Sequence, residues 1–269
     1  MPFSFLDFPT FAGCFLAPGI NLTMYEAVKK LARRWLPKQL LLKNELFLRK
    51  ILAFKYKGDK VGCNICGSRL CNFICLKNGE KLCPSCGSLP RNRRLWDLLV
   101  ERRLLHGDVL DFSPSRCLAR KMREQKRLRY VSSDFVGEFE AEKSHDITAI
   151  AEPDGQFDLV VCYHVLEHVD NDRKAIAELF RVLKPGGKAV IQTPFKDDGI
   201  YEDPSITAPA ERLKHFGQED HVRIYSATGL AERLQTAGFM VEIMHFDSNT
   251  VSDHYFGMKE NETILIASK

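Results

Sequence analysis

The 269-residue sequence lacks any apolar run long enough to cross a membrane, and it contains no internal repeat or low-complexity tract. A membrane-spanning helix needs about 18 or more consecutive apolar residues. The first twenty residues are apolar, but they lack the basic start of a secretory signal peptide, and Asp7, Pro9 and Pro18 interrupt them. These absences predict a cytoplasmic protein without a transmembrane segment.

Disulfide bonds are rare in the cytoplasm, so the nine cysteines favour metal binding over cross-links. Cys63 and Cys66 form a C-x2-C pair, and Cys83 and Cys86 repeat it after sixteen intervening residues. This spacing is typical of a zinc ribbon, in which four thiolates surround one structural Zn²⁺ ion. A ribbon of this size has little apolar core, so we expect the metal to supply most of its folding free energy.

Charge is unevenly divided along the chain. Residues 1–107 hold 19 Lys and Arg against 7 Asp and Glu, whereas residues 108–269 hold 20 against 28. The basic part includes three arginines in the segment Pro90–Arg94, and the planar guanidinium group matches phosphate oxygens. A phosphate-binding role and a solvated helix start are alternative interpretations of these arginines.

Apolar and basic positions are interspersed over residues 22–57, which predicts two helices separated at Pro37. Either these helices pack on the domain that follows, or they form an arm that contacts a membrane surface or nucleic acid. We divide the chain into a basic helical arm (1–59), a zinc-ribbon-like module (60–90), a linking helix (91–107) and an α/β domain (108–269).

Short apolar runs alternate with helical patterns from Asp108 onward, which indicates a mostly parallel sheet with helices on both faces. The six runs are Val109–Phe112, Arg129–Val131, Phe157–Cys162, Lys188–Gln192, Met240–His245 and Thr263–Ile266. The last two runs are joined by a loop rather than a helix, so we expect an antiparallel hairpin that closes one edge.

The stretch FDLVVCYHVLEHVDNDRKAIAELFRVLKPGGKAVIQTPF, from Phe157 to Phe195, resembles the class I S-adenosylmethionine-dependent methyltransferases. The L-E-H turn after one strand and the K-P-G-G turn before the next carry this resemblance, which spans residues 108–269. The segment CPSCGSLPRNRRLW is similar to a subgroup with an N-terminal zinc ribbon. The resemblance implies a Rossmann-like sheet of seven strands, with S-adenosylmethionine across the carboxyl ends of the first strands.

The family's cofactor contacts, carried over to matching positions, implicate residues that follow three strands. Asp134 would hydrogen-bond the ribose hydroxyls, while Asp146 and Ile147 would flank the adenine ring. The residues implied on the methionine side are Cys162, Tyr163 and His164.

One segment departs from the family pattern. A glycine-rich D-x-G-x-G-x-G loop usually follows the first strand, but residues Asp111–Cys117 contain no glycine. Glycine lets the backbone approach the cofactor closely and adopt a positive φ. Residues with a side chain therefore leave the cofactor less room at this loop. We expect an altered but working site in which Asp111, Ser113, Pro114 and Ser115 contact the cofactor.

The insertion after Phe195 is rich in titratable side chains, as a substrate pocket on a loop would be. We take His221 as the general base, oriented by Asp220 or Glu219, because histidine titrates near neutral pH. The alternative is that His221 only hydrogen-bonds the adjoining segment. The candidate substrate-binding residues are Tyr201, Glu202, Gln218 and Arg223. Arg223 would hold an anionic substrate or pair with nearby carboxylates.

The leading hypothesis is a methyltransferase that acts on an oxygen or nitrogen nucleophile of a small molecule, such as a sugar or secondary metabolite. A methyltransferase that holds RNA with its basic front is the first alternative. Against RNA, Phe73 is the sole aromatic near the ribbon tip that would stack on bases. The second alternative is a non-enzymatic zinc-ribbon adaptor on a vestigial methyltransferase fold. The glycine-free loop motivates this alternative.

Overall fold

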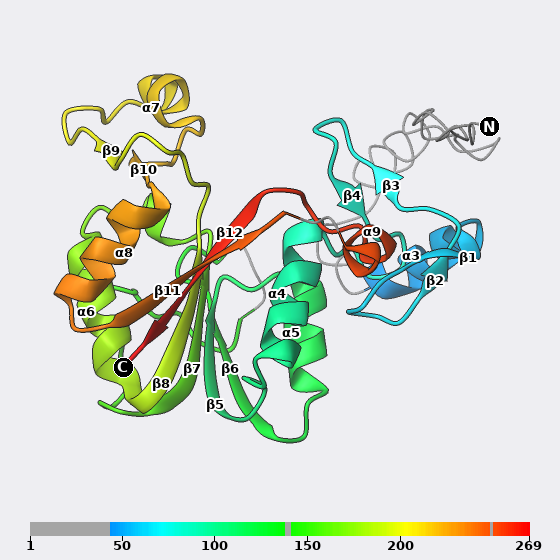
Figure 1. The fold of residues 1–269 in the computed structure, drawn as a ribbon, viewed down its shortest axis with the longest axis horizontal. Coiled ribbons are helices and arrows are strands. Elements are labelled where there is room, and N and C mark those ends of the chain that lie inside the picture. Colours follow the sequence, from blue (N-terminus) through cyan, green and yellow to red (C-terminus); the bar gives the residue numbers. More distant parts are fainter. Residues whose placement is uncertain (1–43, 138–140, 248–249) are drawn as a thin grey trace, which may run out of the picture.

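The computed structural model describes residues 44–137, 141–247 and 250–269. Its centre is a six-stranded sheet with the order β11-β12-β8-β7-β5-β6 (Figure 1). The strands are β5 (Gly107–Phe112), β6 (Leu128–Ser133), β7 (Phe157–Tyr163), β8 (Leu183–Gln192), β11 (Met240–Phe246) and β12 (Glu262–Ser268). The four strands from β5 to β8 run parallel, and β12 is antiparallel to both of its neighbours. The predicted mostly parallel α/β sheet is confirmed.

The seventh strand implied by the family resemblance is not present in the part of the chain that the structure describes. Beyond β6, the pairing is reduced to one parallel bridge between Ser133 and Lys143. Phe135 and Val136 follow β6 but are exposed, and Gly137 comes next. The segment therefore lacks the apolar run that a buried parallel strand needs.

The expected antiparallel pairing of the last two strands is confirmed. The expectation that a loop without a helix joins them is wrong. β11 and β12 pair from Met240–Ser268 to Phe246–Glu262, but β12 lies between β8 and β11, so β11 forms the edge. The connection contains the short helix α9 (Val251–Phe256). Thr250 caps this helix by accepting a hydrogen bond from the backbone N–H of Asp253, which periodicity alone did not indicate.

Helices cover both faces of the sheet. One face packs against α6 (Asp172–Val182) and α8 (Ala227–Thr236), and the other against α4 (Pro90–Glu101) and α5 (Arg116–Arg123) (Figure 1). Successive residues of a strand point to opposite faces, so Leu110 belongs to the first core and Val109 to the second.

The cysteine-rich segment forms two small antiparallel sheets. They consist of β1 (Lys57–Gly62) with β2 (Arg69–Leu70), and β3 (Ile74–Cys75) with β4 (Lys81–Leu82). Helix α3 (Glu45–Phe54) precedes them, and β1 begins at Lys57, inside the segment expected to be helical. The helix expected before Pro37 lies outside the described residues. Ile65 and Phe73 share the second core with Leu159 of β7, so the ribbon and the sheet are packed as one body.

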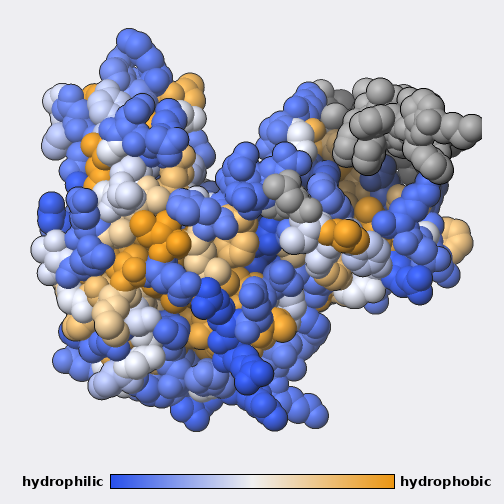
Figure 2. Space-filling view, viewed as in Figure 1, coloured by the Kyte–Doolittle hydropathy of each residue, from blue (hydrophilic) through white to orange (hydrophobic). Residues whose placement is uncertain are grey.

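The segment after β8 forms a separate lobe above the carboxyl ends of the parallel strands. It contains β9 (Tyr201–Glu202), α7 (Pro209–Phe216) and β10 (Arg223–Ile224). Figure 2 shows a notch in the molecular outline between this lobe and the ribbon. The carboxyl ends of β5, β7 and β8 point toward the notch (Figure 1). Across the described ranges, no helix has the length and apolar character to traverse a bilayer.

Candidate cofactor site and metal centres

The four predicted ribbon cysteines converge on one point. The Sγ atoms of Cys63 and Cys86 are 3.7 Å apart, those of Cys66 and Cys83 are 3.8 Å apart, and all four lie within 4.8 Å of one another. Four thiolates about 2.3 Å from a tetrahedral ion are separated by about 3.8 Å. The sulfur separations therefore match those expected of four thiolates around one Zn²⁺-sized ion.

The two halves of the cluster have the same backbone turn. Gly67 donates from its N–H to the carbonyl of Cys63 over 2.8 Å, and Gly87 does the same to Cys83 over 2.9 Å. Both glycines have positive φ, +70° and +78°, a conformation that disfavours residues with a Cβ atom. Each glycine thus permits the turn that brings its pair of sulfurs to the same side.

Arg93 and Arg94, two of the three arginines considered for phosphate binding, are buried inside the protein. The guanidinium group of Arg93 donates to the carbonyl oxygens of Ser88 and Gly257, both at 2.8 Å. Arg94 forms a 2.6 Å ion pair with Asp253. These arginines join the ribbon and α4 to the α9 segment, so they do not present a surface to a nucleic acid.

The loop after β5 keeps a glycine-like conformation without a glycine. Ser113, which occupies the position of the first glycine in the family pattern, has φ +49°. A left-handed conformation costs a non-glycine residue about 1–2 kcal/mol and is often kept at functional sites. The Ser113 backbone N–H donates to the carbonyl of Ser133, and its hydroxyl donates to Oδ1 of Asp134 over 2.8 Å. The ends of β5 and β6 are therefore tied together.

The two aspartates expected at the cofactor lie in different surroundings. Asp134 directly follows β6 at the carboxyl edge, where its carboxylate meets Ser113. Asp111 lies within β5, and its Oδ2 accepts from the hydroxyl of Tyr130 over 2.9 Å. Complete burial raises the pKa of Asp111 to about 7. Asp134 is thus placed at the strand edge, whereas Asp111 lies below it in the core.

The expected adenine-side residues adjoin this edge. Oδ1 of Asp146 accepts from the backbone N–H and the hydroxyl of Thr148, both at 2.8 Å. These hydrogen bonds lower the pKa of Asp146. Ile147 is buried in the core formed with α6. Of the other expected loop residues, Ser115 directly precedes α5 as its N-cap residue and Pro114 is buried beside it.

The residues expected on the methionine side point in different directions. Cys162 is buried in the core beneath α6, and Tyr163 packs on the opposite face of the sheet. His164 follows β7 with φ +55°, a second left-handed non-glycine residue at this edge. Two strained residues at the ends of neighbouring parallel strands mark the edge as a candidate functional site.

Several buried polar atoms at the same edge lack hydrogen-bond partners among the described residues. They are Glu167 Oε2, Gln192 Oε1 and Thr193 Oγ1. These residues lie at or just beyond the carboxyl ends of β7 and β8. Buried polar atoms are nearly always hydrogen-bonded, so this group indicates a place that receives a polar ligand. A cofactor with many polar groups fits that requirement.

His221 belongs to a cluster that contains Glu167 and His168. One ligating atom of each of the three lies within 4.8 Å of the others. Asp220 lies beside His168 rather than His221, with 3.2 Å between its Oδ2 and His168 Nδ1. Nδ1 of His221 instead donates to the carbonyl of Phe216 over 3.2 Å. Burial, followed by the proximity of His168, lowers the pKa of His221.

Neither Glu167 nor His168 was among the candidate residues predicted from the sequence. Both belong to the L-E-H turn, the short helix η1 (Leu166–His168) after β7. Their relation to His221 depends on the insertion folding back over β7, which sequence spacing does not reveal. The signal available in the sequence was the acidic and imidazole pair next to a strand end.

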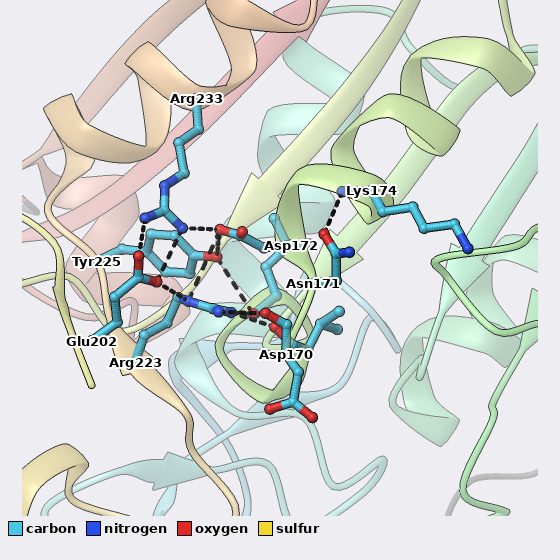
Figure 3. A network of polar contacts seen from close by, with 10 residues as sticks. Asp170, Asn171, Asp172, Lys174, Glu202, Arg223, Tyr225 and Arg233 are labelled. Atoms are coloured by element: carbon cyan, nitrogen blue, oxygen red, sulfur yellow. Dashed lines mark hydrogen bonds and ion pairs between the residues drawn. The ribbon is translucent and has the colours of Figure 1, made fainter. Parts of the chain in front are cut away.

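Arg223 and Glu202, two of the expected substrate residues, form part of a polar network (Figure 3). The Arg223 Nε donates to Glu202 over 2.8 Å, and its terminal nitrogens donate to the carbonyls of Leu166, Val169 and Asp170. Arg233 also pairs with Glu202 at 2.5 Å. The structure thus matches the interpretation in which Arg223 pairs with nearby carboxylates.

The other two expected substrate residues are exposed on the insertion. The hydroxyl of Tyr201 lies 2.7 Å from Nδ1 of His215, and Gln218 follows the left-handed Gly217 that ends α7. Both are accessible to a ligand, and neither reaches the cluster around His221 through a contact between described side chains.

Comparison with known proteins matches residues 89–242 to a family model described as a methyltransferase domain, which is more than half of the chain. A probable S-adenosylmethionine-dependent methyltransferase of Mycolicibacterium smegmatis is 39% identical over 90 residues, 34% of this chain and 31% of the relative. The ubiquinone biosynthesis O-methyltransferase of Pseudomonas fluorescens Pf-5 is 30% identical over 102 residues, 37% of this chain and 44% of the relative. The chain thus spans less than half of either relative's length.

Among solved structures, a S-adenosylmethionine-dependent methyltransferase from Archaeoglobus fulgidus aligns with a TM-score of 0.46 at 18% identity. The alignment covers 66% of this chain and 94% of that structure.

Proposed function

The chain belongs to the methyltransferase-domain family, and from this premise we propose that it transfers the methyl group of S-adenosylmethionine to an oxygen or nitrogen atom of a small molecule. The observation that carries the proposal is the carboxyl edge of β5, β6, β7 and β8. There the strained Ser113 meets Asp134, and polar atoms of Glu167, Gln192 and Thr193 are buried without hydrogen-bond partners among the described residues.

Binding of the cofactor is assigned to groups at the strand ends. Asp134 would accept hydrogen bonds from the ribose hydroxyls, while Asp146 and Ile147 would flank the adenine ring. The Ser113–Ser115 loop would contact the methionine portion together with His164. The bound cofactor supplies an activated methyl group on a sulfonium sulfur.

The protein's task is then to orient the acceptor and to manage its proton. We assign removal of the acceptor's proton to the group formed by Glu167, His168 and His221. In this group, Asp220 would orient His168. This group lies just beyond the end of β7, next to the expected methionine side. The exposed Tyr201 and Gln218 of the insertion are available to contact the acceptor molecule.

We assign a structural Zn²⁺ ion to Cys63, Cys66, Cys83 and Cys86. The support is the fit of the sulfur separations to a tetrahedral ion. Because ribbon side chains belong to the core that contains Val109 and Leu159, the ion would brace the sheet as well as the ribbon.

A small-molecule acceptor is favoured over RNA because Arg93 and Arg94 are buried. A sugar or secondary metabolite fits the small-molecule class. The Pseudomonas relative, an O-methyltransferase of ubiquinone biosynthesis by name, supports an acceptor of this size.

Calorimetric titration of the zinc-loaded protein with S-adenosylmethionine and S-adenosylhomocysteine tests the proposal. We expect micromolar binding, and we expect Asp134→Ala to weaken it at least tenfold because charge-assisted hydrogen bonds contribute about 1.5–3 kcal/mol each. Asp154→Ala is the matched control, since Asp154 is exposed and lies away from the strand edge. Absence of binding to either ligand would contradict the enzyme proposal and favour the adaptor alternative.

A further inference from the structure

We propose that Glu167, His168 and His221 form a binding site for one divalent transition-metal ion, separate from the four-cysteine cluster. Glu167 and His168 come from η1, and His221 comes from the segment between α7 and β10. The fold brings one ligating atom from each within 4.8 Å of the other two. Two imidazole nitrogens and one carboxylate oxygen form a recurrent ligand set for such ions.

The carboxylate of Glu167 provides independent evidence for a ligand. Its side chain is 1% exposed, and its Oε2 atom has no hydrogen-bond partner in the part of the chain that the structure describes. A buried carboxylate oxygen without a partner is destabilising, because burial removes its hydrogen bonds to water. A bound cation would satisfy this oxygen and neutralise its charge.

Each of the three residues also contacts a second group outside the cluster. Nδ1 of His168 lies 3.2 Å from Oδ2 of Asp220, and Nδ1 of His221 donates to the carbonyl of Phe216. Because a carbonyl oxygen only accepts, Nδ1 of His221 carries the proton and its Nε2 keeps a lone pair for a metal; the Asp220 carboxylate beside Nδ1 of His168 favours the same tautomer in that ring.

Glu167 completes this outer layer. Its Oε1 lies 3.1 Å from Nδ1 of His164, which leaves Oε2 as the atom available to a cation. Metal-ligating residues characteristically have such outer partners, which fix their tautomer and orientation. A cluster that met by chance would not be expected to have all three ligands oriented in this way.

Arg223 holds the two halves of the site together as a positioning residue. It donates to three carbonyls around η1, and the neighbouring Val222 donates from its backbone N–H to the carbonyl of Glu167 over 2.9 Å. These contacts fix η1 next to the segment that contains His221.

The donor set selects the class of ion. Imidazole suits Zn²⁺, Fe²⁺, Mn²⁺ and Co²⁺, whereas Ca²⁺ and Mg²⁺ prefer sites built from oxygen atoms. With an ion bound, Glu167, His168 and His221 would act on the acceptor's proton through the metal rather than as bases, because the ion would lower the pKa of a hydroxyl group that ligates it; this favours an oxygen acceptor over a nitrogen acceptor. That consequence rests on the proposed methyltransferase function, but the metal site itself does not.

The test is metal content after equilibration with Zn²⁺ or Mn²⁺ and removal of loosely bound ions. The full-length protein is expected to retain one equivalent of zinc at the cysteines and a second equivalent of the added metal. Glu167→Gln is expected to lose only the second equivalent. His215→Gln is the matched control, because His215 lies on α7 and contacts Tyr201 outside the cluster. Mg²⁺ is expected not to provide the second equivalent.

Asp220→Asn provides a second variant that does not disturb the interior, since the Asp220 side chain is 68% exposed. Loss of an outer-layer partner typically weakens metal binding about 10–100-fold, and calorimetric titration with Zn²⁺ would measure that change. A single equivalent in the wild-type protein, or a second one unaffected by both substitutions, would overturn the proposal. Cofactor titration is a separate measurement, so loss of the proposed function would be distinguished from loss of the metal site.

Discussion

The four-cysteine cluster and the Glu167–His168–His221 cluster are assembled by different means. In the first, two short turns each provide two sulfurs, and the pairs are separated by sixteen residues. In the second, two residues of η1 meet a histidine more than fifty positions later, after the insertion has folded back. The first cluster can be predicted from the sequence because local turns assemble it. The second cannot be predicted in this way, because it is assembled by packing between distant segments.

The surroundings of the two clusters also differ. Three of the four cysteines, Cys63, Cys83 and Cys86, lie in the core that joins the ribbon to β5 and β7, so loss of the cluster affects the stability of the whole protein. The second cluster lies at the carboxyl edge under the insertion and is held by Arg223. Its loss is therefore expected to affect ligand binding more than folding.

The largest effect is expected from Cys83→Ser, which removes one of the four sulfurs. Structural zinc binding contributes about 10–16 kcal/mol to small zinc domains, so we expect a fall in melting temperature of more than about 10 °C. Thermal unfolding followed by circular dichroism would measure it. Cys75→Ser is the control, because Cys75 is exposed and outside the cluster. Equal melting temperatures for both variants would show that the cluster does not support the fold.

Arg223→Met is expected to have the next largest effect. The substitution removes the donor to the carbonyls of Leu166, Val169 and Asp170 and leaves Glu202 with Arg233 alone, and hydrogen bonds from a charged group contribute about 1.5–3 kcal/mol each. Urea unfolding would measure the loss. Arg212→Met on α7 is a suitable comparison, since Arg212 donates only to the carbonyl of Ile206 among its described contacts. A loss equal to that of Arg212→Met would contradict the positioning role.

Asp111→Asn is expected to change how stability depends on pH. Burial raises the folded-state pKa of Asp111 to about 7, so the wild-type carboxyl keeps its proton between about pH 4 and 7. Its contribution to stability is present below the unfolded-state pKa and is lost as the pH rises through the folded-state pKa. Asparagine does not ionise and can still accept from Tyr130.

The advantage of Asp111→Asn over wild type should therefore grow by about 2–3 kcal/mol between pH 5 and pH 8. Urea unfolding at the two pH values would measure it. An advantage independent of pH would contradict the buried position of Asp111.

The smallest effects are expected at Ser113, where two substitutions separate strain from hydrogen bonding. Ser113→Ala loses the hydrogen bond to Asp134 and keeps the strained φ, so it should be destabilised by about 1 kcal/mol. Ser113→Gly loses the same bond but relieves the strain, so its stability should stay close to wild type. Equal losses in the two variants would indicate that the left-handed conformation is not strained in solution.

Much of the fold was predictable from the sequence because its signals are local. The six apolar runs became six strands, and the C-x2-C-G pattern became two matching turns. The seventh strand was an inference from the family, and the exposed Phe135 and Val136 show why that inference fails for this chain. The insertion of β12 between β8 and β11 depends on long-range pairing that periodicity does not encode.

The candidate site was less predictable. Asp134 and His164 could be placed at strand ends because parallel strands bring their carboxyl ends to one edge. Other features depend on packing between distant segments and could not be predicted. They are the face of the sheet on which Tyr163 lies, the pairing of Asp220 with His168 and the burial of Arg223. The roles of Asp134 at the cofactor and of His221 at the acceptor stay predictions.

Hydrogen exchange measured with and without S-adenosylhomocysteine tests the central claim, the cofactor site at the carboxyl edge, most directly. We predict slower exchange in segments 111–117, 132–136 and 162–168, and unchanged exchange in the zinc-loaded ribbon at residues 60–90. Asp134→Ala should remove the protection. Protection centred on the ribbon, or no protection at a saturating ligand concentration, would contradict the account.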